Sequence, residues 1–251
     1  MKTIVERQLP FETLRLPDAR TPLPLPAQRG EGRGEGPSFQ TTIQYRSRLH
    51  RYIGDRPELI FFTFLILIFS GPTILGVVWK GMTFHPAAVQ AGQWWRLFTH
   101  PFVHVTWYHL LLDAAAFLML YNGLIEPSRA KRLSCVAAGW AGSLMMAWFA
   151  APMIFSTGLC GLSGIAHGLM AVSAAEMMTG RSRDSLEWRI GATTFVIVVV
   201  KAAYEAVTGK ILFAFLYFGL VGDPVTVSHA GGIIGGLLMW LVCHSTAARR
   251  A

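Results

Sequence analysis

The sequence predicts an all-α membrane protein built as a bundle of six transmembrane helices. Of its 251 residues, 53% are hydrophobic and 14% are charged, which is too apolar for an ordinary soluble domain. Six apolar runs approach the roughly 20 residues that an α-helix needs to cross a bilayer. The basic residues, in addition, lie mostly on one side of these runs. Together these three observations predict a multi-pass protein whose main partner is the lipid bilayer.

The six predicted spans follow one another after residue 58. They cover residues 59–78, 107–124, 133–155, 160–178, 190–207 and 227–243. The first apolar run begins at Leu59, so it is expected to be an uncleaved anchor. A further apolar run, 211–221, is too short to span and is expected to lie at the membrane interface, with a seventh span as the alternative.

The formal net charge of +8 is explained by topology. If the N-terminus is cytoplasmic, eighteen of the 22 lysines and arginines fall in cytoplasmic segments, ten of them before Leu59. This distribution is the positive-inside bias of membrane proteins. The basic excess therefore predicts cytoplasmic N- and C-termini and argues against a nucleic-acid partner.

Composition divides the chain into a tail, a membrane domain and a short end. In residues 1–58, five prolines between positions 10 and 26 are followed by an alternating run of glycine and charged residues, so this segment cannot bury a core. They are predicted to form a disordered cytoplasmic tail. The membrane domain is predicted over 59–244, with a second cytoplasmic tail over 245–251.

The loop between the first two spans is the longest one, and it is rich in aromatic residues. It contains Trp94, Trp95, Phe98 and Phe102 next to Arg96. Aromatic rings combined with a cation are typical of elements that lie in the membrane interface. A folded hairpin, partly embedded in the interface, is therefore expected here.

Ser163 and His229 are the candidate catalytic pair. Each lies near the start of a predicted span, and a serine hydroxyl in hydrocarbon requires a polar partner. A serine on one helix and a histidine on another is what a nucleophile and its base require. Cys160 is an alternative nucleophile, but a small buried residue explains it better.

Glycines at four-residue spacing accompany both candidate residues. Gly164 and Gly168 lie on the span of Ser163, and Gly232 and Gly236 lie on the span of His229. This spacing lets membrane helices approach closely. It is explained by plain helix packing, by the need to bring serine and histidine together, or by both.

Ionisable residues inside the other spans are further candidates. His109 and Asp113 share one face of the second span, and His104 precedes them. An Asp at mid-membrane costs roughly 2.5–3.5 kcal/mol on insertion scales, so Asp113 is a functional candidate by default. Lys201 and Glu205, four residues apart in the fifth span, are expected to neutralise each other as a structural pair.

Taken together, these motifs resemble the rhomboid intramembrane serine proteases, and the resemblance covers residues 94 to about 243. The matching positions are Trp95-Arg96, Thr99-His100, His104, His109, Asp113, Glu126, Gly161-x-Ser163-Gly164 and His229-x-x-Gly232-x-x-x-Gly236. The Trp-Trp-Arg-Leu and Gly-Leu-Ser-Gly-x-x-His-Gly strings are similar to the rhombosortase branch. That branch is associated with bacterial proteins that carry a C-terminal Gly-Gly sorting tail.

The resemblance implies a catalytic dyad in a cavity open to the outside, without a cofactor and without a third carboxylate. Ser163 would attack the scissile bond of single-span membrane substrates, and His229 would take its proton. The Ser163 N–H, His109 and residue 113 would hold the oxyanion, with Gly161, Gly164 and His104 supporting the site. A bacterial inner membrane is the expected location.

Two positions depart from the family pattern. Many rhomboids have Asn at position 113, so Asp113 is either protonated and donates as Asn does, or ionised and holds His109 as the imidazolium. His167 occupies the place of an aromatic residue that stacks on the catalytic histidine; it is expected to stack on His229, and the alternative is that His167 is itself the base.

Two other classes of function remain as alternatives. One is a catalytically inactive rhomboid-like protein that binds membrane proteins. The other is a metal- or haem-binding membrane protein with His104, His109, Asp113 and His229 as ligands. The sequence has no His-Glu-x-x-His motif that would favour this second alternative.

Overall fold

A computed structural model describes residues 56–248 of the chain, and this part is all-helical. The predicted tail therefore lies outside the described residues up to position 55. At the other end, the last helix continues to Ala248, so residues 245–248 of the predicted cytoplasmic tail are helical. Residues 249–251 lie outside the described part.

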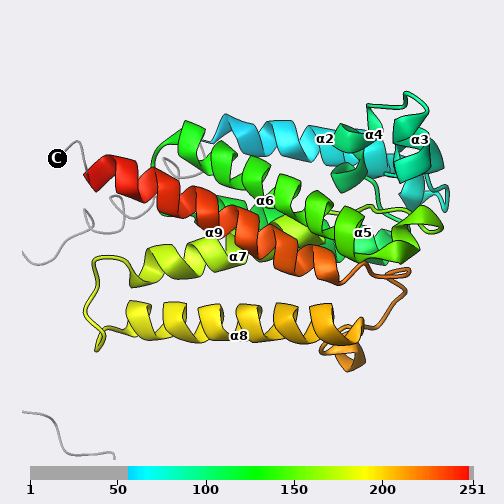
Figure 1. The fold of residues 1–251 in the computed structure, drawn as a ribbon. Helices are drawn as coiled ribbons and strands as arrows, with labels where there is room; N and C mark the ends of the chain where they lie inside the picture. Colours follow the sequence, from blue (N-terminus) through cyan, green and yellow to red (C-terminus); the bar gives the residue numbers. More distant parts are fainter. Residues whose placement is uncertain (1–55, 249–251) are drawn as a thin grey trace, which may run out of the picture. The chain divides into compact units, whose positions relative to one another are not determined.

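Six long helices coincide in position with the six predicted spans (Figure 1). They are α2 (Pro57–Ile74), α5 (Trp107–Gly123), α6 (Arg129–Ala150), α7 (Ser163–Met178), α8 (Leu186–Thr208) and α9 (Val227–Ala248). The all-helical class is confirmed for the described residues, which contain one isolated β-bridge and no strand.

Four of these helices, α2, α6, α8 and α9, are long and apolar enough to cross a membrane. The other two, α5 and α7, have only 17 and 16 residues. The segment Arg96–Phe102 precedes α5 at an angle of 95° and could extend it into a broken span or a re-entrant element. The chain is thus a multi-pass membrane protein, and the count of six spans stays a prediction.

Helix α7 lies at the centre of the bundle, where it contacts α5, α6, α8 and α9 (Figure 1). Small residues allow this position. A Cβ atom added to Gly168 would lie 2.5 Å from the backbone oxygen of Gly232, so the two backbones can touch only because Gly168 has no side chain. Helix α9 makes a second close contact with α6, where Gly231 meets Gly142.

The outer surface of the bundle is apolar. Large side chains such as Ile60 on α2, Val207 on α8 and Leu238 on α9 are 76%, 87% and 59% exposed. A water-soluble monomer rarely shows so much contiguous apolar surface. These faces are therefore suited to contact lipid.

The loop between α2 and α5 is folded into four short helices. They are η1 (Lys80–Met82), α3 (Pro86–Gln90), α4 (Arg96–Thr99) and η2 (His100–Phe102). The Arg96 guanidinium donates to the carbonyls of Lys80 and Thr83, at 2.8 and 2.6 Å, and so holds the loop together. The depth of this loop in the bilayer stays a prediction.

This loop is also tied to the chain that leads into α7. Phe84 and Leu159 exchange two backbone hydrogen bonds of 3.0 and 2.9 Å, and the Gly161 N–H donates to the carbonyl of His100 at 3.0 Å. Backbone groups at membrane depth must be paired inside the protein. The turn before Ser163 is thereby held in one conformation.

The apolar run 211–221 contains only the short helix η4 (Ala214–Leu216), so it offers no seventh spanning helix. Phe215, Phe218 and Leu220 are 80–93% exposed. Two contacts attach the run to the start of α5: the Thr106 hydroxyl donates to the carbonyl of Leu220, and the Phe218 N–H donates to the Tyr108 hydroxyl.

Candidate active site

Ser163 and His229 meet at one end of the bundle, where α7 and α9 begin. Ser163 is the first residue of α7, and His229 lies in the first turn of α9. Their side chains are within hydrogen-bond distance, with His229 Nε2 3.1 Å from Ser163 Oγ. His229 is buried and Ser163 is partly buried. The structure therefore brings together the two residues that the sequence predicted as a pair.

The second ring nitrogen of His229 faces a carboxylate. Glu205 Oε2 lies 2.7 Å from His229 Nδ1. A carboxylate accepts hydrogen bonds, so this network assigns the proton of neutral His229 to Nδ1 and leaves the Nε2 lone pair facing the Ser163 hydroxyl. His229 thus has the tautomer that a general base requires. The resemblance implied no third carboxylate, and the structure differs by placing Glu205 here.

Glu205 also forms the expected pair with Lys201. Lys201 Nζ is 2.6 Å from Glu205 Oε1, and the Leu212 N–H donates to the same oxygen at 3.0 Å. The Glu205 side chain is fully buried. Each carboxylate oxygen therefore has its own partners: Oε1 has the ammonium and the backbone, and Oε2 has His229.

His167 stacks on His229, one helical turn after Ser163. The ring centroids are 4.0 Å apart and the planes are inclined by 10°. His167 Nδ1 lies 2.7 Å from the Ser163 carbonyl oxygen, and Nε2 lies 2.9 Å from Lys201 Nζ. Both ring nitrogens are engaged away from Ser163 Oγ, so this geometry favours stacking over a role as the base.

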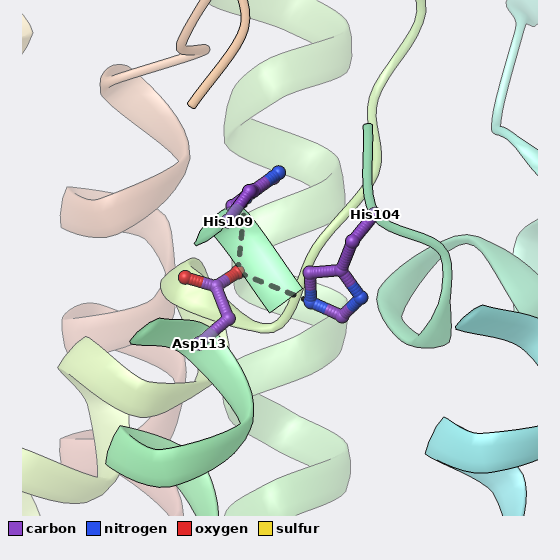
Figure 2. Close-up of side chains that lie close together, drawn as sticks. All are labelled: His104, His109 and Asp113. Atoms are coloured by element: carbon purple, nitrogen blue, oxygen red, sulfur yellow. Dashed lines mark ion pairs between the residues drawn. The ribbon is translucent and has the colours of Figure 1, made fainter. Parts of the chain in front are cut away.

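Figure 2 shows the second cluster, in which His104 and His109 both face Asp113. Asp113 Oδ2 is 3.2 Å from His109 Nε2 and 3.5 Å from His104 Nε2. The same oxygen accepts the backbone N–H groups of Leu162 and Ser163, at 2.9 and 3.0 Å. An oxygen that receives two backbone donors acts as an acceptor, so Oδ2 of Asp113 does not itself carry a proton.

His104 is completely buried and is fixed by α2. Its Nδ1 lies 2.8 Å from Ser70 Oγ, while the Ser70 hydroxyl donates to the carbonyl of Phe102 at 2.6 Å. This leaves Nε2 directed at Asp113. His104 thus lies behind the carboxylate, and His109 lies beside the cavity that Ser163 lines.

Two glycines of the Ser163 motif leave room for this arrangement. Gly161 has a φ of +98°, and a Cβ there would lie 2.7 Å from Asp113 Oδ2 and 2.9 Å from His109 Nε2. A Cβ on Gly164 would overlap the hydroxyl of Ser143 on α6. Both positions require glycine for a local steric reason.

A cavity of about 460 Å³ connects the two clusters. Its lining comes mainly from α5, from α7 and α9 and from the segments that precede these two helices, with Lys201 from α8. The polar groups in it include His109, Asp113, Ser163, His167, Lys201 and His229. A mostly apolar cavity with a few convergent polar groups is typical of a site that binds a substrate. Cys160 also lines it, but has no hydrogen bond to a base among the described residues.

Two groups of residues have the composition of a metal site: His104, His109 and Asp113, and His167, Glu205 and His229. In the first, two backbone N–H groups already point at the carboxylate oxygen. In the second, the Lys201 ammonium lies within 3 Å of both Glu205 and His167. A metal cation would have to displace or approach these donors, so the contacts disfavour it in either group.

The contact between Glu205 and His229 is the site feature that sequence analysis missed. The available signal was a carboxylate inside a predicted span, which is a functional candidate by default. Lys201, one turn away, offered a complete local explanation for it. The contact of the second carboxylate oxygen of Glu205 with His229 becomes visible only when α8 is packed against α9.

A match to a known protein family covers the whole of this site. Residues 91–246, more than half of the chain, match the sequence model of the Rhomboid domain. All of the predicted site residues, from His104 to His229, lie within the match. No curated protein matches the chain.

Proposed function

The chain belongs to the rhomboid family, and from this premise we propose that it is an intramembrane serine protease. It would cleave peptide bonds in or near the transmembrane segments of membrane-anchored proteins. The observation that carries the proposal is the 3.1 Å contact between Ser163 Oγ and His229 Nε2 beside an apolar cavity. The tautomer of His229 that Glu205 favours leaves Nε2 free to accept the hydroxyl proton.

In the proposed reaction, Ser163 Oγ attacks the scissile carbonyl carbon while His229 Nε2 takes its proton. His229 then returns this proton to the leaving amine, and an acyl-enzyme forms on Ser163. A water molecule, deprotonated by the same nitrogen, attacks the ester and releases the second product. The cavity supplies the space for the substrate and for this water.

For the oxyanion, we propose that His109 is the main donor and that Asp113 is ionised. The Ser163 N–H, which the family resemblance would assign to the oxyanion, already donates to Asp113 Oδ2. His109 faces both that carboxylate and the cavity. An ionised Asp113 would hold His109 as an imidazolium, which is a stronger donor than a neutral ring.

We further propose that the site opens toward the outside of a bacterial inner membrane, with both termini in the cytoplasm. The positive-inside distribution of Lys and Arg supports this orientation. The substrates would be single-span proteins, and the rhombosortase-like motifs favour those with a C-terminal sorting tail. Normal processing of such proteins in a strain that lacks this chain would contradict the substrate assignment.

The direct test is covalent labelling of the detergent-solubilised protein with a fluorophosphonate. Wild type should be labelled, and Ser163→Ala and His229→Ala should not be. A folded, monodisperse wild type that resists labelling would contradict the proposal and favour a catalytically inactive homologue. Metal analysis of the same sample then tests the metal-binding alternative.

A further inference from the structure

We propose that Glu205 is the third member of the catalytic group, a positioning residue that acts through His229. The proposal rests on the proposed protease function, because it concerns the same serine and histidine. It replaces a two-residue dyad by a chain of three groups: Ser163 on α7, His229 on α9 and Glu205 on α8. In this arrangement α8 takes part in the chemistry as well as in packing.

The first argument is geometric. Glu205 Oε2 is 2.7 Å from His229 Nδ1, on the side of the ring opposite to Ser163. The position of this carboxylate is fixed from several directions, since Oε1 bonds to Lys201 and to the Leu212 N–H. The Glu205 carbonyl also accepts the Thr226 hydroxyl at 2.8 Å, three residues before His229. Two separate contacts thus tie α8 to the start of α9.

The second argument concerns protons. When Nε2 takes the serine proton, the ring becomes an imidazolium whose positive charge is shared with Nδ1–H. A buried carboxylate 2.7 Å from Nδ1 stabilises that ion and holds the ring in the productive tautomer before the reaction. A neutral imidazole without this partner can carry its single ring proton on Nε2. That nitrogen would then be unable to accept the hydroxyl proton of Ser163.

The third argument is that a simple Lys–Glu pair does not account for all the contacts. Such a pair needs only Oε1, yet Oε2 is aimed at His229. Lys201 extends the network, because it also donates to Nε2 of His167, whose ring stacks on His229. The charged and titratable groups around His229 thus include Ser163 and His167 from α7 and Lys201 and Glu205 from α8. The same cavity is also lined by His109 and Asp113 of α5 and by Cys160, Tyr217 and Asp223.

The test compares two substitutions with opposite consequences. Glu205→Gln keeps the shape of the side chain and removes its charge, whereas Glu205→Asp keeps the charge and shortens the side chain. A positioning carboxylate predicts a loss of about 10³- to 10⁴-fold in the fluorophosphonate labelling rate for Glu205→Gln. It predicts a smaller loss for Glu205→Asp. If Glu205 served packing alone, Glu205→Asp would lose more activity than Glu205→Gln, and this result would overturn the proposal.

Two controls separate this effect from general damage. Glu176→Gln removes another buried carboxylate, which caps the backbone at Ile125 and Glu126 near the far end of α7, and should leave the labelling rate within about twofold of wild type. Lys201→Met breaks the same ion pair from the other side. The proposal requires that Glu205→Gln lose far more activity than Lys201→Met. Equal losses would mean that Glu205 acts only as the structural partner of Lys201, and would overturn the proposal.

A spectroscopic readout reports the tautomer independently of activity. In protein labelled with ¹⁵N in its histidine rings, His229 of the wild type should show a protonated Nδ1 and an unprotonated Nε2, and Glu205→Gln should change this pattern. If Glu205→Gln does not fold, the double variant Glu205→Gln, Lys201→Met removes both charges and is measured instead.

The outcomes also separate this proposal from the proposed function. If the wild type is not labelled at all, the protease function fails, and the third-member proposal fails with it. If the wild type is labelled through Ser163 but Glu205→Gln is labelled equally fast with an unchanged histidine spectrum, only the role of Glu205 is overturned.

Discussion

Replacing Asp113 by Asn tests how this site stabilises the oxyanion. Asn is the residue found in many rhomboids, and it has nearly the same shape as Asp. Its single carbonyl oxygen can take the place of Oδ2 and keep the backbone hydrogen bonds from Leu162 and Ser163. What the substitution removes is the negative charge that faces His104 and His109.

The expected loss follows from this difference. His109 Nε2 lies 3.2 Å from Asp113 Oδ2. On the proposed assignment, His109 without the carboxylate becomes a neutral ring, so the site loses much of the strength of one oxyanion donor. Removal of one such donor typically costs 10²–10³ in rate, or about 3–4 kcal/mol of transition-state stabilisation. We therefore expect Asp113→Asn to fold normally and to cleave or label about 10²-fold more slowly.

A double-mutant cycle makes this assay more specific. If Asp113 acts through His109, then His109→Ala and the double variant should be equally slow, because the two residues share one effect. Additive losses would mean that they act separately. Full activity in Asp113→Asn would refute the reasoning and would support a protonated Asp113 that donates to the oxyanion as Asn does.

Three further predictions follow from single contacts. His167→Phe should label within about tenfold of the wild-type rate, because a phenyl ring can keep the stacking on His229; loss of all labelling would make His167 a candidate base. Arg132→Met should lower the free energy of unfolding in detergent by about 1–3 kcal/mol, because the buried Glu58 carboxylate loses its ion pair with Arg132 but keeps the Tyr121 hydroxyl and Arg129; an unchanged unfolding midpoint would contradict a stabilising role of the Arg132–Glu58 pair. Gly161→Ala should fold but react more slowly than wild type, since its Cβ would press on the carboxylate of Asp113, and an unchanged labelling rate would argue against a rigid turn.

The sequence could predict where the helices lie because membrane helices are recognisable from their apolar composition. Every long helix falls on a predicted apolar run, and the start of α7 lies within three residues of its predicted span. The pairing of Ser163 with His229 was also accessible, since both begin glycine-rich runs that enter the membrane from the same side. In each case the signal is local, in composition or in short-range spacing.

What the sequence could not predict depends on packing between distant segments. The second contact of Glu205 requires the crossing of α8 and α9, and its local pairing with Lys201 gave no reason to look for another partner. The bond between Asp113 and the Ser163 N–H depends on the backbone turn at Gly161, whose positive φ directs two N–H groups at α5. A residue pattern does not encode either arrangement.

The lengths of α5 and α7 connect the fold to the proposed chemistry. With 16 residues, α7 is about 24 Å long, shorter than the roughly 30 Å of hydrocarbon in a bilayer. If its last turn lies at the cytoplasmic surface, as the following Arg181 and Arg183 indicate, Ser163 lies several ångströms below the opposite surface. The chain before it is not helical and must be paired by other segments, which the bridge between Phe84 and Leu159 provides.

The same argument applies to α5, which begins beside the loop that forms this bridge. The two helices too short to be counted as spans are therefore those that carry Ser163, His109 and Asp113. A spanning helix of full length would place these positions inside continuous hydrocarbon, with no room for the water that the proposed hydrolysis of an acyl-enzyme requires. Shortening both helices at one end leaves space for the cavity between them, which the proposed proteolysis inside a membrane requires.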